Sequence, residues 1–169
     1  LSFVSTQPLW REKTMGRAKT VVENEEQLVA KLIEYVEKLA EEKLKKDASS
    51  IFSIGLSGGS MIRQMSKALT GCTHIDAARV KLFMVDERMH PTEHAESNGG
   101  AYQRQLGEPW AQRLVLVDVK EGDVVGTAAA YQAKLTQQIA PEMVGGVPRF
   151  DLVLLGLGPD GHTASLFPG

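Results

Sequence analysis

The sequence has few of the features that mark several large classes of protein. It contains one cysteine, Cys72, so no disulfide can form within the chain, which fits a reducing compartment. The formal net charge is −2, which gives no general attraction for nucleic acid. No apolar run approaches the ~20 residues that span a bilayer, and residues 1–14 lack the apolar centre of a secretory signal. We therefore expect a cytoplasmic protein that binds neither nucleic acid nor membrane.

What is present is the composition of an ordinary globular protein. The 169 residues are 43% hydrophobic and 24% charged. A chain of this length is typically one domain that buries its core without disulfides or metals. Residues 1–20 are polar and aperiodic, so we expect a loose N-terminal leader there, followed by one domain over residues 21–169.

Hydrophobic periodicity predicts alternating helices and strands. Between Asn24 and Lys46, apolar residues recur at three- and four-residue spacing, which is typical of an amphipathic helix. The charge run from Glu41 to Lys46 is expected to be its solvated end. Four short apolar runs indicate strands, and the segments between them indicate further helices. The expected strands are 51–56, 80–85, 114–119 and 150–155, and the expected helices are 61–69, 98–106 and 127–139.

This alternation predicts an α/β fold. Most of the expected strands are apolar on both faces, as in a parallel sheet that is covered on both sides. We therefore expect a three-layer, doubly wound (Rossmann-like), mostly parallel sheet with helices on both faces. Ligands of such sheets bind at the carboxyl ends of the strands.

Two polar clusters directly follow expected strands. In residues 57–60 (Ser-Gly-Gly-Ser), two glycines let the backbone approach a ligand, and amides at a helix start favour an anion. A tight turn without a ligand is the alternative interpretation. In residues 86–88 (Asp-Glu-Arg), the guanidinium of Arg88 suits phosphate or carboxylate. The two acids could hold Arg88 or transfer protons, and a plain surface ion pair is the alternative.

A third cluster, residues 156–162, is a glycine-rich loop that presents Asp160 and His162. An imidazole that titrates near neutral pH is the usual general base, and Asp160 is close enough in sequence to orient it. A lone histidine is more often structural, but its place in a glycine-rich loop after a buried strand favours function.

The remaining reactive side chains are weaker candidates. His90 and His94 are four residues apart, but Pro91 between them argues against a helix, and no third metal ligand is evident at matching spacing. We therefore expect two loop histidines and no metal site. Cys72 lies in a turn-like stretch without a motif, which favours a partly buried structural thiol.

The three clusters, in this order, resemble the 6-phosphogluconolactonase family, which belongs with the glucosamine/galactosamine-6-phosphate isomerases. The resemblance runs from about Val21 to Gly169. It rests on residues 56–60 (LSGGS), on 86–88 (DER) followed by Ser97-Asn98, and on 151–168 (DLVLLGLGPDGHTASLFP). The DER triplet and the TASLFP ending are similar to the lactonase branch and unlike the isomerase branch.

The resemblance implies hydrolysis of 6-phospho-D-glucono-1,5-lactone to 6-phosphogluconate, the second step of the oxidative pentose phosphate pathway, without a cofactor. His162 would be the general base, with Asp160 beside it. The partner would be the small-molecule lactone, and a monomer is one assembly that fits. The implied substrate- and phosphate-binding residues are Ser57, Gly58, Gly59, Ser60, Asp86, Arg88 and Asn98.

The chain departs from the family pattern in three respects. Met61-Ile62 stand where the family usually has Thr-Pro, and Gly99 stands where it tends to have an aromatic residue. Family members usually continue well past Phe-Pro-Gly, so we expect a C-terminally truncated sheet. Two other functions stay open. One is an isomerase/deaminase that uses Asp86 to carry a proton, and the other is a non-catalytic sugar-phosphate-binding protein.

Overall fold

The computed structural model describes residues 19–139 and 143–168 of the chain. The expected leader over residues 1–20 lies almost entirely outside these residues, so it stays an expectation. Within the described part, no helix combines the length and the apolar character that crossing a membrane requires.

The centre of the fold is a parallel sheet with the strand order β3-β2-β1-β6. The chain moves outward from β1 to β2 and β3, and then returns to the other side of β1 with β6. This reversal is the mark of a doubly wound sheet, and it confirms the expected fold. The strand bounds are β1 Phe52–Leu56, β2 Val80–Met84, β3 Leu114–Val115 and β6 Leu152–Leu154.

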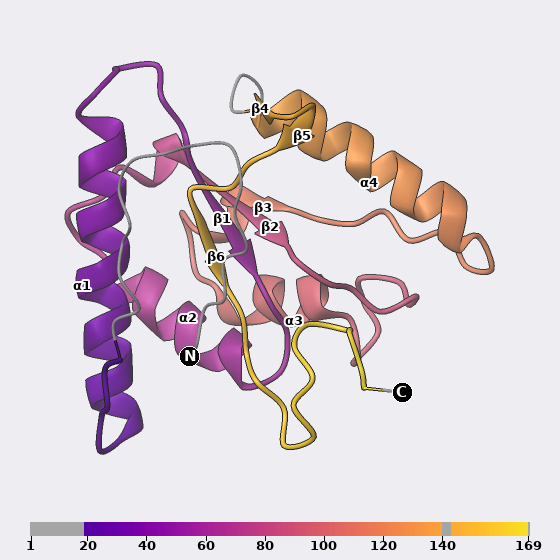
Figure 1. Ribbon diagram of the computed structural model, residues 1–169, viewed down its shortest axis with the longest axis horizontal. Helices are drawn as coiled ribbons and strands as arrows, with labels where there is room; N and C mark the ends of the chain where they lie inside the picture. Colours follow the sequence, from indigo (N-terminus) through magenta and orange to yellow (C-terminus); the bar gives the residue numbers. More distant parts are fainter. Residues whose placement is uncertain (1–18, 140–142, 169) are drawn as a thin grey trace.

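Helices cover both faces of this sheet, with α1 and α4 on opposite sides (Figure 1). Because α4 connects β3 back across the sheet to β6, against the direction of the earlier connections, right-handed crossovers place it on the face opposite to α2 and α3. A small antiparallel hairpin that the sequence did not predict follows α4. The bounds are α1 Glu25–Leu44, α2 Ser60–Gly71, α3 Asn98–Gln105, α4 Val124–Ile139, β4 Met143–Val144 and β5 Val147–Pro148, with 3-10 turns at Ala77–Arg79 and Ala111–Arg113.

Alternation along the strands divides the buried side chains between the two faces of the sheet. One set packs with α1, α2 and α3 into the main core, whose largest fully buried members include Tyr102, Phe52 and Met65. The other set includes Phe83, whose ring lies 5.4 Å from that of Phe150. All five residues of β1 are buried, and its one polar side chain, that of Ser53, donates a hydrogen bond to the Asp151 carboxylate at 2.8 Å.

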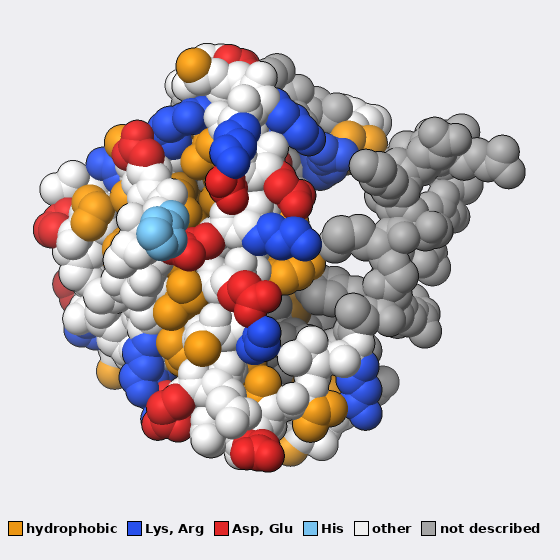
Figure 2. Space-filling model, turned by 90° about the vertical axis from the view of Figure 1, so that its left-hand side faces the viewer, with side chains coloured by type: hydrophobic (Ala, Val, Ile, Leu, Met, Phe, Trp, Pro, Cys, Tyr) orange, Lys and Arg blue, Asp and Glu red, His pale blue; other side chains and the backbone are white. Residues whose placement is uncertain are grey.

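The outer face of α1 is polar, as the charge pattern predicts. Figure 2 shows this side of the molecule, where acidic and basic side chains lie intermixed. Lys45 pairs with Glu41 one turn away, and both side chains are more than half exposed. The buried stripe of the same helix is Leu32, Val36 and Ala40. Most of the charge run is therefore the solvated end of the helix, but Lys43 is not, because its ammonium lies 3.1 Å from the Asp151 carboxylate and only 18% of its side chain is exposed.

The expected strand over 114–119 is wrong in length, because β3 contains only Leu114 and Val115. Beyond it, side chains of α4 take over the hydrogen bonds that a longer strand would make. The Tyr131 hydroxyl accepts from the Met84 amide at 2.8 Å and donates to the Met84 carbonyl at 3.0 Å. The Lys134 ammonium donates to the Leu116 carbonyl at 3.0 Å. Side chains from another element thus replace strand pairing, which periodicity cannot reveal.

Replacing Tyr131 with Phe should lower the free energy of unfolding by about 1–3 kcal/mol, because the polar backbone atoms of buried Met84 lose their partner. Urea unfolding of the full chain measures this change. Tyr35→Phe is the matched control, since Tyr35 is 42% exposed, and it should change stability by less than about 0.5 kcal/mol. Equal effects of the two substitutions would contradict the role given to the hydroxyl.

Candidate active site

The three polar clusters lie at one edge of the sheet. Strands β1, β2 and β6 are parallel neighbours, so their carboxyl ends meet at the edge where β1 leads into α2 (Figure 1). The sheet bonding continues up to the clusters, because the Ser57 amide donates to the Leu154 carbonyl at 3.2 Å and the Val85 amide donates to the Leu56 carbonyl at 2.9 Å. The strand order reverses between β1 and β6, which is where doubly wound sheets bind ligands.

The turn after β1 leads into the uncapped start of α2. Gly59 adopts φ +68°, a conformation that favours glycine, and no side chain caps the helix that begins at Ser60. By contrast, α1 and α3 are capped by the side chains of Asn24 and Ser97. Both Gly59 and Ser60 are exposed, whereas the Ile62 amide donates to the Gly59 carbonyl at 3.2 Å, so any site at this helix start is limited to its first residues.

Met61 and Ile62, which stand where the family that the sequence resembles usually has Thr-Pro, are part of the hydrophobic core. Their side chains are 5% and 9% exposed. At these two positions the chain therefore contributes apolar packing between α2 and the sheet, and no hydroxyl to the edge.

Gly58 lies directly against the side chain of Asn98. A Cβ at Gly58 would lie 2.6 Å from the Asn98 Cγ, which is closer than any ordinary contact. Asn98 itself is 6% exposed, at the start of α3. The glycine is therefore needed so that α3 can approach the turn after β1.

Asp86 connects the segments that form this edge. Its Oδ1 accepts from the Ser57 hydroxyl at 3.2 Å, and its Oδ2 accepts from the Ser165 hydroxyl at 2.7 Å. The side-chain amide of Asn98 donates to Oδ2 at 3.3 Å and to the Asp86 carbonyl at 3.2 Å. One carboxylate thus joins the turn after β1, the start of α3 and the segment that follows β6.

Glu87 binds the start of α3. Its carboxylate accepts from the backbone amides of Asn98 at 2.7 Å and Gly99 at 2.8 Å, and from the Ser97 hydroxyl at 3.2 Å. A negative charge at this end also complements the helix dipole. A Cβ at Gly99 would lie 2.8 Å from Leu116 and 3.1 Å from the Glu87 carboxylate. The glycine that departs from the family pattern therefore permits this close approach.

The guanidinium of Arg88 pairs with neither of its acidic neighbours among the described residues, which excludes two of the interpretations left open by the sequence, a held guanidinium and a surface ion pair. Both carboxylates point to other partners, and the Arg88 side chain is exposed. Within residues 19–139 and 143–168, no hydrogen bond or ion pair engages its guanidinium. The charge is available to an external anion, which is the state expected of a binding group.

Asp160 and His162 form a close pair in the loop after β6. Asp160 Oδ1 lies 2.5 Å from His162 Nδ1 and also accepts from the His162 amide at 3.2 Å. This hydrogen bond from the imidazole holds the pKa of Asp160 below its ordinary value. A side chain at Gly158 would overlap the His162 ring, and the Gly158 amide donates to the His162 carbonyl at 2.8 Å. The glycine-rich loop therefore determines where the imidazole lies.

Several residues of this edge were missed by sequence reasoning. Ser165 lies inside the quoted TASLFP segment, but nothing in the pattern marks it as a partner of Asp86. Tyr102, fully buried on α3, donates its hydroxyl to the Ser57 carbonyl at 3.0 Å, and burial raises its pKa. Its four-residue spacing from Asn98 places it on the same side of α3, and this was the only available signal.

His90 and His94 lie in a loop, as predicted, but the sequence analysis missed a third potential ligand beside them. Glu96 lies beside them, and ligand atoms of the three side chains all lie within 4.8 Å of one another. Such a group forms on an irregular loop, where the helical spacing sought in the sequence does not apply.

Comparison with known proteins gives the family. A family model described as glucosamine-6-phosphate isomerases/6-phosphogluconolactonase matches residues 23–169. The chain belongs to this family. The 6-phosphogluconolactonase of Homo sapiens is 39% identical to this member over 127 residues, which cover 72% of this chain and 48% of the relative. That of Rattus norvegicus is 40% identical over 124 residues, which cover 70% of this chain and 47% of the relative.

Solved structures agree with this assignment to the isomerase/lactonase family. The 6-phosphogluconolactonase of Trypanosoma brucei superimposes with a TM-score of 0.73 at 28% identity, covering 89% of this chain and 63% of that one. The chain spans about half the length of the curated relatives it matches. The activity of the whole protein is therefore taken up as a proposal.

Gly58→Ala should destabilise the protein by about 1–3 kcal/mol, because the added methyl group overlaps Asn98 and either α3 or the turn must move. Thermal or urea unfolding measures the loss. Gly107→Ala is the matched control, since a Cβ there meets nothing within 4 Å, and it should not lower stability. An equal loss in the control would show that the Asn98 contact is not responsible.

His162→Ala should raise the pKa of Asp160 towards its ordinary value, because the imidazole hydrogen bond is the largest cause of the lowering. A carboxyl titration by NMR measures this change. In the wild type, the ionised carboxylate stabilises the loop above the ordinary pKa, and this contribution is lost as the pH falls through the lowered value. His74→Ala, on an exposed turn, should leave the Asp160 titration unchanged. An unmoved Asp160 in His162→Ala would contradict the pairing.

Proposed function

We propose that the protein containing this chain hydrolyses 6-phospho-D-glucono-1,5-lactone to 6-phosphogluconate, with His162 as general base. The observation that carries the proposal is the Asp160–His162 pair, 2.5 Å apart, at the switch-point edge of the sheet. The names of its relatives support the choice of substrate.

The geometry of the pair suits proton transfer. Asp160 accepts from Nδ1, which favours the tautomer with a basic Nε2. Because its pKa is lowered, Asp160 stays ionised and can stabilise the imidazolium that forms. His162 is partly exposed, with 28% of its side chain accessible, so a water molecule and a ligand can reach it.

The reaction balances with water and one base. His162 Nε2 takes a proton from water while the water oxygen bonds to the lactone carbonyl carbon. The tetrahedral adduct then collapses, the bond from this carbon to the ring oxygen breaks, and the proton passes from His162 to that oxygen. The product is a carboxylic acid and a free hydroxyl group, and the acid then releases its proton to the solvent to give the carboxylate. Since lactones already hydrolyse slowly in water, positioning and one base can meet the catalytic demand.

The phosphate group is proposed to bind between the start of α2 and Arg88. Gly59 and Ser60 expose amides that no side chain caps, and Arg88 offers a guanidinium without a protein partner among the described residues. Amides at a helix start and a guanidinium are both well suited to a phosphate dianion.

The sugar is proposed to lie over the residues that Asp86 joins. Asp86 is half-buried, and its carboxylate can accept further hydrogen bonds from sugar hydroxyls. Ser57, Gly58 and Asn98 are held against it and would form the wall of the site. Ser57 and Asn98 are buried, so they would contribute to the shape of the site more than to its charge.

His162→Ala should lower the rate of lactone hydrolysis by at least ~100-fold, the usual scale for loss of a general base. The assay follows acid release from the phosphorylated lactone by the full-length protein. His74→Ala should retain full activity, because His74 lies on an exposed turn that contributes nothing to the edge.

The same assay separates the other functions. Unchanged hydrolysis in His162→Ala would remove this residue from the mechanism. Release of ammonia from glucosamine 6-phosphate, without lactone hydrolysis, would replace the proposal with the isomerase/deaminase reaction. Thermal stabilisation by the sugar phosphate without turnover would indicate a binding protein.

A further inference from the structure

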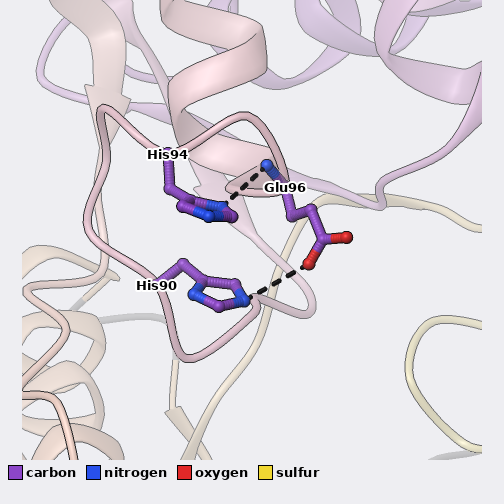
Figure 3. A group of neighbouring side chains, drawn as sticks. All are labelled: His90, His94 and Glu96. Carbon is purple, nitrogen blue, oxygen red and sulfur yellow. Dashed lines mark hydrogen bonds and ion pairs between the residues drawn. The ribbon is translucent and has the colours of Figure 1, made fainter.

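The loop between β2 and α3 carries a group of potential metal ligands outside the proposed active-site pair. His90, His94 and Glu96 project from this loop towards one another (Figure 3). Each offers one ligand atom, and these atoms all lie within 4.8 Å of one another. In the described part of the chain, no other three histidine, cysteine or acidic residues meet this condition.

The contacts within the group are specific. His90 Nε2 lies 3.3 Å from Glu96 Oε2, as the dashed line in Figure 3 shows. The two imidazole rings stack with centroids 4.0 Å apart and planes at 16°. The Glu96 amide donates to His94 Nδ1 at 3.2 Å, so this nitrogen carries a lone pair that is free of a proton.

We propose that His90, His94 and Glu96 bind a divalent transition-metal ion of the Zn²⁺ class. Two imidazoles and one carboxylate are a set that Zn²⁺ accepts, with water in the fourth position. The same set is a poor match for Mg²⁺ or Ca²⁺, which prefer oxygen ligands throughout. The ligand chemistry therefore selects the class of ion.

Side-chain rotations are needed to complete the site. Metal–ligand bonds of about 2.0–2.2 Å in a tetrahedron bring ligand atoms to roughly 3.4 Å from one another, compared with the present limit of 4.8 Å. The His90 and Glu96 side chains are 39% and 64% exposed, so packing does not hinder their rotation. The stacked rings must turn so that their lone pairs converge, which exchanges the stack and the 3.2 Å hydrogen bond for coordinate bonds.

The ion would cross-link a loop that carries a residue of the proposed phosphate site. The His90 amide donates to the Arg88 carbonyl at 2.7 Å, and the Ser97 amide donates to the His94 carbonyl at 3.1 Å. Metal binding would therefore fix the chain between Arg88 and the cap of α3. The proposed metal site does not depend on whether the proposed hydrolysis is correct.

Two other places could compete for a soft or borderline ion. Cys72 is a poor ligand because burial raises the pKa of its thiol to about 12, so the thiolate is scarce. Asp160 and His162 offer two ligand atoms, one fewer than the loop group. The experiment must separate this pair from the proposed site.

Calorimetric titration of the metal-free full chain with Zn²⁺ should show one ion bound per chain. His94→Ala and Glu96→Gln should each weaken binding by at least ~10-fold, the lower bound known even for loss of an outer-shell partner. Glu96→Gln keeps the backbone amide that bonds His94, so it tests the carboxylate alone. His74→Ala and His162→Ala should bind as the wild type does.

Several outcomes would overturn the proposal. Unchanged Zn²⁺ affinity in both His94→Ala and Glu96→Gln would do so, as would loss of binding in His162→Ala alone. Equal affinity for Mg²⁺ and Zn²⁺ would also contradict the ligand set. Bound Co²⁺ gives a visible absorption spectrum, and loss of this spectrum in His90→Gln would independently support coordination by the imidazole.

Discussion

The arrangement of the candidate site depends on the carboxylate of Asp86. Strand β2 lies beside β1, and Asp86 comes two residues after β2 ends, so its side chain meets the turn that begins at Ser57. The same carboxylate reaches Asn98 on α3 and Ser165 beyond β6. Three segments distant in sequence are thus joined through one half-buried charge. A charge-assisted hydrogen bond is stronger than a neutral one, so this group can hold irregular segments that no sheet or helix supports.

Asp86 and Glu87 bind neighbouring segments of the fold, and neither binds the guanidinium of Arg88. Glu87 binds the amides of Asn98 and Gly99 at the start of α3, and Asp86 binds side chains across the edge. Arg88 is left exposed and without an ion-pair partner in the described part of the chain. From their adjacency in the sequence, Arg88 would be expected to form an ion pair with Asp86 or Glu87. The helix amides compete successfully for Glu87 because they supply two short bonds in fixed directions.

Interactions from α4 determine how far the sheet extends. A third strand of six residues was expected from the apolar run, but Tyr131 and Lys134 provide the bonding beyond Val115. The hydroxyl of Tyr131 bonds both the backbone N–H and the C=O of Met84, so the end of β2 has hydrogen-bond partners without a longer β3. A hydrogen bond from a side chain and one from a strand meet the same requirement, and the sequence pattern does not distinguish them.

The sequence by itself determined the order and type of the main elements, because their apolar periodicity reflects which positions must be buried. It also identified Asp160 and His162 as partners, since two residues separated by one glycine in a tight loop meet through local geometry. Tertiary structure alone decided that Asp86 binds Ser165 and that Glu96 joins the histidines of its loop. These contacts depend on how irregular segments fold onto the sheet edge, and such segments have no periodicity from which their neighbours could be predicted.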